Sequence, residues 1–135
     1  MIGGVGCDIV DVSRMKRWVN DEKMLRYIFN EKEIIGTDSE KKYSEQKRCE
    51  HYAVRFAAKE AFAKALGTGM SGFSTKDVFI TNDENGAPIL HIENKAKDIF
   101  EKRIEKKIDD CKIFVSLSHE KSNAIAFVVI DKLSG

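Results

Sequence analysis

The segment SEQKRCEHYAVRFAAKEAFAKAL (residues 44–66) decides the fold that we expect for this chain. Gly67 follows it, and glycine ends many helices because it adopts the left-handed backbone conformation at little cost. Within the segment, the apolar side chains recur at helical spacing: Tyr52, Phe56, Phe62 and Leu66. The segment therefore predicts one long amphipathic helix.

One face of this predicted helix combines small residues with two charges. Ala53, Ala57, Glu60 and Lys64 fall close together on it. The alanines would let another backbone come near, and the four-residue step from Glu60 to Lys64 points both side chains into one crevice. From the helix alone, a solvated ion pair is the simpler interpretation, because such pairs are common.

The segments around the helix predict strands and shorter helices. Short helices are expected near residues 11–14, 25–29 and 30–33, and a longer amphipathic one over 94–108, whereas residues 37–46 are polar and loop-like at first. Residues 82–87 carry a hairpin signal. Strands are predicted over residues 2–9, 77–81, 88–92, 112–118 and 124–130. The expected class is α+β, with a mainly antiparallel sheet packed against the long helix.

Length and composition favour a single soluble module over residues 1–135. The chain is 42% hydrophobic and 33% charged with one proline, as in ordinary globular proteins. No apolar run approaches the ~20 residues of a membrane span, and no secretion signal opens the sequence. We therefore expect a cytoplasmic protein that binds no membrane. Cys7, Cys49 and Cys111 form no Cys-x-x-Cys pair, which predicts buried free thiols.

Two carboxylates are candidates for one metal site. Asp8 lies at the end of the first predicted strand, and Glu60 lies on the long helix. Two carboxylates completed by phosphate oxygens and water suit Mg²⁺, which seldom occupies an all-protein cage. Lys64 would add a point charge to the anion, and backbone N–H groups around Gly67 and Thr68 could approach it closely. The ordinary alternatives are a turn aspartate, a surface ion pair and a helix cap.

Three blocks of the sequence stand out together. They are Gly4-Val-Gly-Cys-Asp-Ile9 with Arg14, Arg55 through Gly69, and Ser116-Leu-Ser-His119 leading to residues 124–129, with Asn85-Gly-Ala-Pro88 before the third. In order and spacing these blocks resemble the signature motifs of the holo-[acyl-carrier-protein] synthases, in the 4'-phosphopantetheinyl transferase superfamily. The resemblance covers essentially the whole chain.

The resemblance implies a phosphopantetheinyl transferase-like fold and a defined reaction. Such an enzyme transfers 4'-phosphopantetheine from coenzyme A to a serine of apo acyl carrier protein, releases adenosine 3',5'-bisphosphate and supports fatty acid biosynthesis. Mg²⁺ would be held by Asp8 and Glu60, and Lys64 would contact the phosphates. The resemblance also implies a homotrimer with active sites between subunits.

The identity of the general base stays open at this stage. Glu60, a metal-bound water and His119 are all candidates for removing the serine proton. A lone histidine is more often structural, but the resemblance favours contact between His119 and phosphate or nucleotide. Glu120 follows His119, and its charge would weaken such a contact. Arg55 could bind the 3'-phosphate in bidentate geometry, or be a solvated helix charge.

A basic stretch containing Arg14, Lys16 and Arg17 is the candidate partner-binding surface. The resemblance implies that an acidic helix of the carrier docks there. Nucleic-acid binding is disfavoured, because the net charge is only +1 and no aromatic ladder accompanies the basic residues. Two other functions remain: a non-catalytic module that binds coenzyme A or acidic carriers, and a metal-dependent phosphohydrolase.

Overall fold

The computed structural model describes residues 1–36 and 43–134 of the chain. The α-helices in these ranges are α1 (Glu22–Ile28), α2 (Glu45–Leu66) and α3 (Asn94–Ile104). The strands are β1 (Ile2–Asp11), β2 (Val78–Asn82), β3 (Pro88–Ile92), β4 (Cys111–His119) and β5 (Asn123–Lys132). Short 3₁₀ helices lie between them: η1 (Val12–Arg17), η2 (Glu31–Glu33), η3 (Thr75–Asp77) and η4 (Ile108–Asp110).

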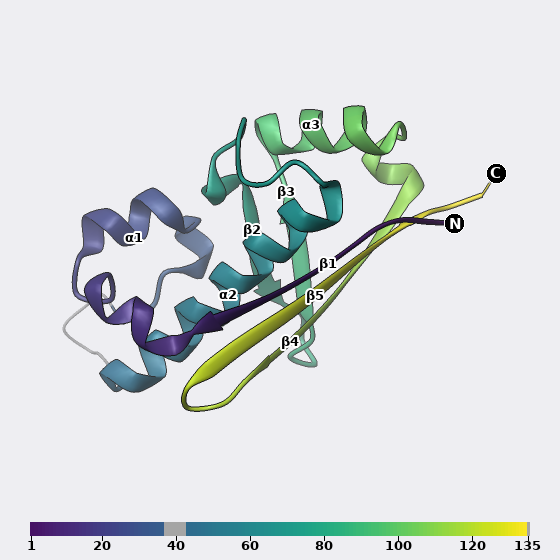
Figure 1. Cartoon of the computed structure of the whole chain (residues 1–135). Helices are drawn as coiled ribbons and strands as arrows, with labels where there is room; N and C mark the ends of the chain where they lie inside the picture. Colours follow the sequence, from purple (N-terminus) through teal and green to yellow (C-terminus); the bar gives the residue numbers. More distant parts are fainter. Residues whose placement is uncertain (37–42, 135) are drawn as a thin grey trace.

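The strands form two antiparallel sheets. β5 lies between β1 and β4 in one sheet, and β2 pairs with β3 in the other. Figure 1 shows the three long strands side by side, with both chain ends at the same end of the sheet. The expected α+β class with antiparallel pairing and a long helix is confirmed. The sequence analysis expected one sheet, whereas the structure has two.

The long helix α2 begins and ends where the sequence predicts. The side chain of Ser44 accepts a hydrogen bond from the backbone N–H of Lys47, which caps the first turn. Gly67 ends the helix in the left-handed region at φ 77°, and its N–H bonds to the carbonyl of Ala63. Polar residues 37–42 precede the cap, and our loop prediction for them lies outside the described residues.

Strand β1 packs directly on the backbone of α2. A Cβ atom on Gly6 would lie 1.9 Å from the carbonyl oxygen of Ala61, and one on Gly4 would lie 2.2 Å from that of Ala65. Only glycine permits this approach. The expected approach of a second backbone to the alanine-rich helix therefore occurs at its C-terminal half, whereas Ala53 and Ala57 are fully buried in the core.

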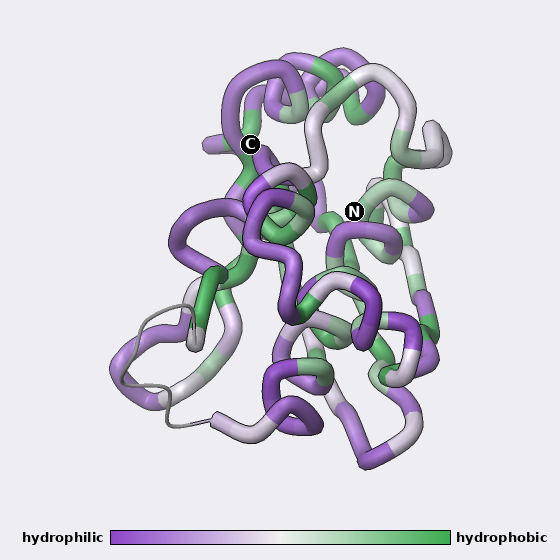
Figure 2. The backbone as a smooth tube through the Cα atoms, turned by 90° about the vertical axis from the view of Figure 1, so that its left-hand side faces the viewer, coloured by the Kyte–Doolittle hydropathy of each residue, from purple (hydrophilic) through white to green (hydrophobic). Residues whose placement is uncertain are grey.

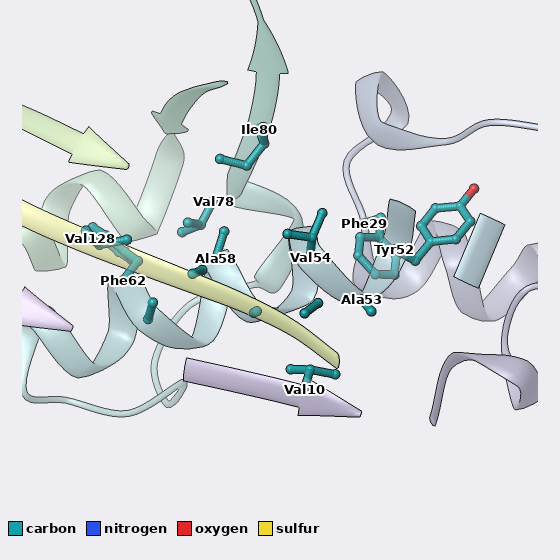
Figure 3. Close-up of a cluster of buried hydrophobic side chains, with 14 of the residues drawn as sticks. Val10, Phe29, Tyr52, Ala53, Val54, Ala58, Phe62, Val78, Ile80 and Val128 are labelled. Carbon is teal, nitrogen blue, oxygen red and sulfur yellow. The ribbon is translucent and has the colours of Figure 1, made fainter. Parts of the chain in front are cut away.

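The buried side chains form one hydrophobic cluster around α2. Figure 3 shows Val10 and Val128 from the larger sheet on one side of the helix, with Val78 and Ile80 from β2 on another. Figure 2 shows hydrophobic stretches along the inner segments of the backbone and hydrophilic ones at the outer turns. None of the described helices has both the length and the apolar character needed to cross a membrane.

Some local predictions need correction. Cys49 is buried, but Cys111 is half-buried and Cys7 is exposed, because Cys7 points away from α2 on the alternating strand β1. Helix α3 ends at Ile104 rather than at residue 108, because Glu105 adopts the left-handed conformation at φ 60°. The capping box at Asn30 and Glu33 is confirmed, although it starts a 3₁₀ helix.

Candidate functional site

Asp8 is held on the face of β1 that packs against α2. Gly6, Asp8 and Val10 alternate along that face, and the two neighbours of Asp8 are buried. β1 is an outer strand of its sheet, so Asp8 lies at an edge beside the helix. This position leaves its side chain partly accessible, with 16% of its surface exposed.

Lys64 reaches Asp8 from the last turn of α2. Its Nζ lies 2.9 Å from Oδ1 of Asp8 and 3.1 Å from the backbone carbonyl oxygen of Cys7. The Asp8 carboxylate raises the pKa of Lys64, mainly through this hydrogen bond. Lys64 is therefore a protonated point charge at neutral pH. It stays in contact with solvent, since 55% of its side chain is exposed.

Glu60 lies one helical turn before Lys64 and is half-buried. Its pKa is raised, first by burial and then by the negative charge of Asp8, while Lys64 and Arg14 partly oppose the shift. The two carboxylates are thus close enough to repel each other. A cation between them would relieve that repulsion.

The donor set fits a hard cation that keeps most of its own water. Among residues 1–36 and 43–134, no three His, Cys, Asp or Glu side chains form a cluster that could hold a metal. A closed zinc site normally uses four such ligands. Asp8 and Glu60 would be the protein's share of a Mg²⁺ shell whose remaining ligands are water or substrate oxygens.

The predicted turn at Gly67 and Thr68 lies some distance from the carboxylates. It follows α2 at the level of Gly4, and Asp8 is four residues further along the strand, roughly 13 Å away. Only an extended ligand would contact both. Arg103 of α3, which our sequence analysis did not single out, donates to the carbonyl of Leu66 from Nη2 at 3.1 Å and so neutralises the negative end of the helix.

Arg55 is neither a solvated helix charge nor a neighbour of Asp8. Its Nη2 donates to Oδ1 of Asn82 at 3.1 Å, beside the β2–β3 hairpin, and its Nη1 donates to the carbonyl of His51 at 3.2 Å. Burial lowers its pKa. Its Nε is buried and has no hydrogen-bond partner among the described residues.

His119 also lies apart from the carboxylate pair. Its Nδ1 is 3.3 Å from Oε1 of Glu50 near the start of α2. Through the register of the sheet, His119 pairs with Ala124, which pairs with Val10 on β1. His119 is therefore two strands from β1, roughly 10 Å across the sheet. Within one chain, the structure brings Asp8, Glu60 and Lys64 together but leaves Arg55 and His119 outside that group.

The three basic partner-binding candidates lie together on η1. Arg14, Lys16 and Arg17 are exposed, whereas Val12 and Met15 of the same turn are buried. The guanidinium of Arg14 lies 5.6 Å from the ring centre of Phe56, and that of Arg17 lies 4.5 Å from the ring centre of Trp18. This is a basic surface with aromatic neighbours, next to Glu60.

Beside the site, a buried ion pair was missed by the sequence analysis. Lys59 precedes Glu60 on α2, and its Nζ lies 2.7 Å from Oε1 of Glu33. Neither side chain is exposed. The capping-box motif drew attention to Glu33 in the sequence, but it did not indicate that Lys59 is the partner of Glu33.

Comparisons with known proteins agree with one another. A family model described as 4'-phosphopantetheinyl transferase superfamily matches residues 4–128. The chain is 42% identical to a holo-[acyl-carrier-protein] synthase from Treponema denticola, covering 97% of this chain and 99% of the relative. It is 43% identical to one from Geotalea daltonii, covering 98% and 100%.

Solved structures show the same similarity. A holo-(acyl-carrier-protein) synthase from Bacillus anthracis, in complex with CoA (3',5'-ADP), matches with a TM-score of 0.73 at 32% identity and covers 98% of each chain. A holo-[acyl-carrier-protein] synthase from Neisseria meningitidis matches with a TM-score of 0.77 at 31% identity, covering 98% of this chain and 100% of the other.

Proposed function

Because the chain belongs to the 4'-phosphopantetheinyl transferase superfamily, we propose that it has holo-[acyl-carrier-protein] synthase activity. It transfers 4'-phosphopantetheine from coenzyme A to a serine of apo acyl carrier protein, in support of fatty acid biosynthesis. The observation that carries the proposal is the grouping of Asp8, Glu60 and Lys64 where β1 meets α2. The whole chain acts as one module, and its cytoplasmic location stays a prediction.

The reaction needs charge neutralisation more than covalent chemistry. The serine Oγ forms a bond to the β-phosphorus of coenzyme A, the bond from that phosphorus to the bridging oxygen breaks, and adenosine 3',5'-bisphosphate leaves with the electron pair. Mg²⁺ held by Asp8 and Glu60 would supply Lewis-acid stabilisation of the charge on the diphosphate. Lys64 supplies a further positive charge, and the Gly67–Thr68 turn lies where a distant part of an extended substrate would pass.

Burial and the negative charge of Asp8 raise the pKa of Glu60 in the metal-free protein, and Glu60 lies beside Asp8 in the same chain. His119 is too far from Asp8 within one chain to take the serine proton beside the same metal. Glu60 and a water molecule are therefore the candidate bases within one chain, whereas His119 could act as the base only from a neighbouring copy. His119 and Arg55 are instead assigned to the nucleotide end of coenzyme A.

Arg55 and His119 lie apart from the group formed by Asp8, Glu60 and Lys64. This separation supports a homotrimer in which each active site is built from residues of two subunits. The outer face of the larger sheet is not covered by any described element, and it exposes large apolar side chains: Val5, Ile9, Phe114 and Phe127. Such a patch typically marks a protein interface. We propose that a neighbouring copy supplies the Arg55 and His119 that do not reach Asp8 within its own chain.

The oligomer can be tested separately from the chemistry. Phe127→Lys changes an exposed position, so the monomer should fold, whereas a charge at the centre of the interface should dissociate the trimer. Light scattering coupled to size exclusion should then report a monomer, and turnover should fall with it. Lys97→Glu, on the exposed side of α3, serves as the control. A wild-type protein that is monomeric at working concentration contradicts the trimer.

The activity itself is tested by mass spectrometry. The protein is incubated with Mg²⁺, coenzyme A and apo acyl carrier protein, and the carrier should gain ~340 Da, the mass of the transferred arm. Free phosphopantetheine in a reaction without carrier would indicate a phosphohydrolase. Binding of coenzyme A or carrier without any mass change would indicate a non-catalytic module.

A further inference from the structure

Lys64 occupies Oδ1 of Asp8, one of the two oxygens of a carboxylate that would hold the metal. The ammonium is 2.9 Å from Oδ1 of Asp8 and 3.1 Å from the carbonyl oxygen of Cys7, so it is held by two oxygen atoms of β1. An ammonium ion and a divalent cation compete for the same carboxylate lone pairs. In the free protein, Lys64 therefore acts as an internal cation.

We propose that Lys64 exchanges partners during the catalytic cycle. It neutralises Asp8 while the site is empty, and it moves to a phosphate of coenzyme A when a divalent cation takes the Asp8 carboxylate. This inference rests on the function proposed above. It adds that Lys64 opposes metal binding in the free protein, and that it stabilises bound coenzyme A once the metal holds Asp8.

The surroundings of Lys64 allow such an exchange without repacking. The side chain is more than half exposed, and lysine carries its charge on a flexible four-carbon stem with three rotatable donors. The helix that carries it is fixed, because β1 contacts α2 at glycine positions where no side chain would fit. Rotation of the Lys64 side chain alone can thus break or form its hydrogen bond to Asp8.

Exchange of this kind couples the two ligands. Coenzyme A offers Lys64 a new anionic partner and so frees Asp8 for the metal, and the metal in turn frees Lys64 for the phosphate. By linkage, each ligand must raise the affinity for the other by the same factor. Removing the lysine should remove this part of the coupling.

Metal binding to the free protein tests the inference directly. Mn²⁺ is the probe, its free concentration is followed by electron paramagnetic resonance, and coenzyme A is absent. Lys64→Met should bind Mn²⁺ about tenfold more tightly than the wild type, because the charged competitor is gone. Lys64→Arg should bind it no more tightly than the wild type, because a guanidinium also neutralises Asp8.

A control variant distinguishes the hydrogen bond of Lys64 to Asp8 from the general effect of a nearby positive charge. Arg14 also acts electrostatically on Glu60, yet it makes no hydrogen bond to Asp8 among the described contacts. Arg14→Gln therefore removes one nearby charge without freeing the carboxylate, and its effect should stay below about threefold. Equal effects of Lys64→Met and Arg14→Gln would overturn the exchange, as would no measurable Mn²⁺ binding to Lys64→Met.

Asp8→Asn distinguishes failure of this inference from failure of the metal assignment. It should abolish Mn²⁺ binding both alone and combined with Lys64→Met. If Mn²⁺ binds independently of Asp8, the proposed metal site and the exchange are both wrong. If binding depends on Asp8 but Lys64→Met matches the wild type, only the exchange is wrong. Circular dichroism of each variant confirms that its fold is retained.

Discussion

Lys59 and Glu33 form an ion pair in the interior of the protein, with no exposed surface on either side chain. The remaining polar atoms of the pair are also satisfied. Nζ of Lys59 donates to the carbonyls of Thr75 at 3.0 Å and Val78 at 2.6 Å, and Oε2 of Glu33 accepts from the backbone N–H of Ile80 at 3.0 Å. The pair therefore joins η2, α2 and β2.

Removing one member of this pair should strongly destabilise the protein. Glu33→Gln leaves the Lys59 ammonium buried without its counter-charge, which costs roughly 3–5 kcal/mol of unfolding free energy. Urea denaturation measures the loss. Glu31→Gln, at an exposed position of the same 3₁₀ helix, should change the stability by less than about 0.5 kcal/mol. Similar values for both variants would contradict the structural role of the pair.

His51 should make the stability depend on pH. Burial lowers its pKa from 6.5 to about 4, with the charge of Arg55 as a further cause. The unfolded chain therefore binds a proton that the folded chain does not, and stability falls as the pH drops from about 6.5 towards 4, by up to about 3 kcal/mol.

Urea denaturation at several pH values, for the wild type and for His51→Gln, isolates this contribution. Glutamine keeps a donor near the carbonyl of Glu33, which lies 2.6 Å from Nε2 of His51, but it does not titrate. The difference in unfolding free energy between the two proteins should be independent of pH above about pH 7 and should change as the pH falls towards 4. A difference that stays constant over the whole range would refute the titration of His51.

Gly6→Ala should disturb both the fold and the site. The added methyl group would overlap the carbonyl oxygen of Ala61, so β1 would have to move away from α2 and carry Asp8 with it. Overpacking of this kind costs about 1–3 kcal/mol. Gly3→Ala is the control, since its nearest contact is the flexible side chain of Lys132 at 3.1 Å. Thermal unfolding and turnover of both variants check the prediction.

Asp8→Ala and Glu60→Ala should each abolish most turnover and leave the fold intact. Each removes one of the two carboxylates proposed to hold Mg²⁺, and neither side chain is part of the hydrophobic core. The Mg²⁺ dependence of turnover and the circular dichroism spectrum are measured together. Asp109→Ala, at an exposed position of η4, should retain activity. Normal turnover with an unchanged metal requirement in either site variant would disprove the shared-metal assignment.

Reversing Arg14 and Arg17 to glutamate should raise the KM for the carrier much more than the KM for coenzyme A. The salt dependence of the carrier KM should also weaken, because exposed attractions are screened over ~10 Å at 0.1 M ionic strength. Lys95 and Lys97 on α3 provide a control reversal of equal charge. Equal effects on both substrates would show that η1 is not the carrier dock.

The sequence predicts those parts of the protein that depend on local periodicity. The helix of residues 44–66, its glycine cap, the strand segments and the hairpin at residues 82–87 follow from spacing and turn residues alone, whereas the pairing of β1 with β5 was not predicted. The burial of Lys59 does not follow from them, because its partner Glu33 lies 26 residues away. The separation of His119 from Asp8 was not predicted either, since motif order along a chain does not report on which strand of a sheet each residue lies.

The pairing of β1 with β5 has a consequence for synthesis of the protein on the ribosome. Asp8 emerges from the ribosome long before Ala126, its partner across the sheet. Contacts between such distant residues form late, because the chain must close a long loop before it gains from them. In a nascent chain, Asp8 therefore lacks its neighbouring strand until residues 123–132 have emerged from the ribosome, and the edge of β1 that faces β5 stays unpaired until then.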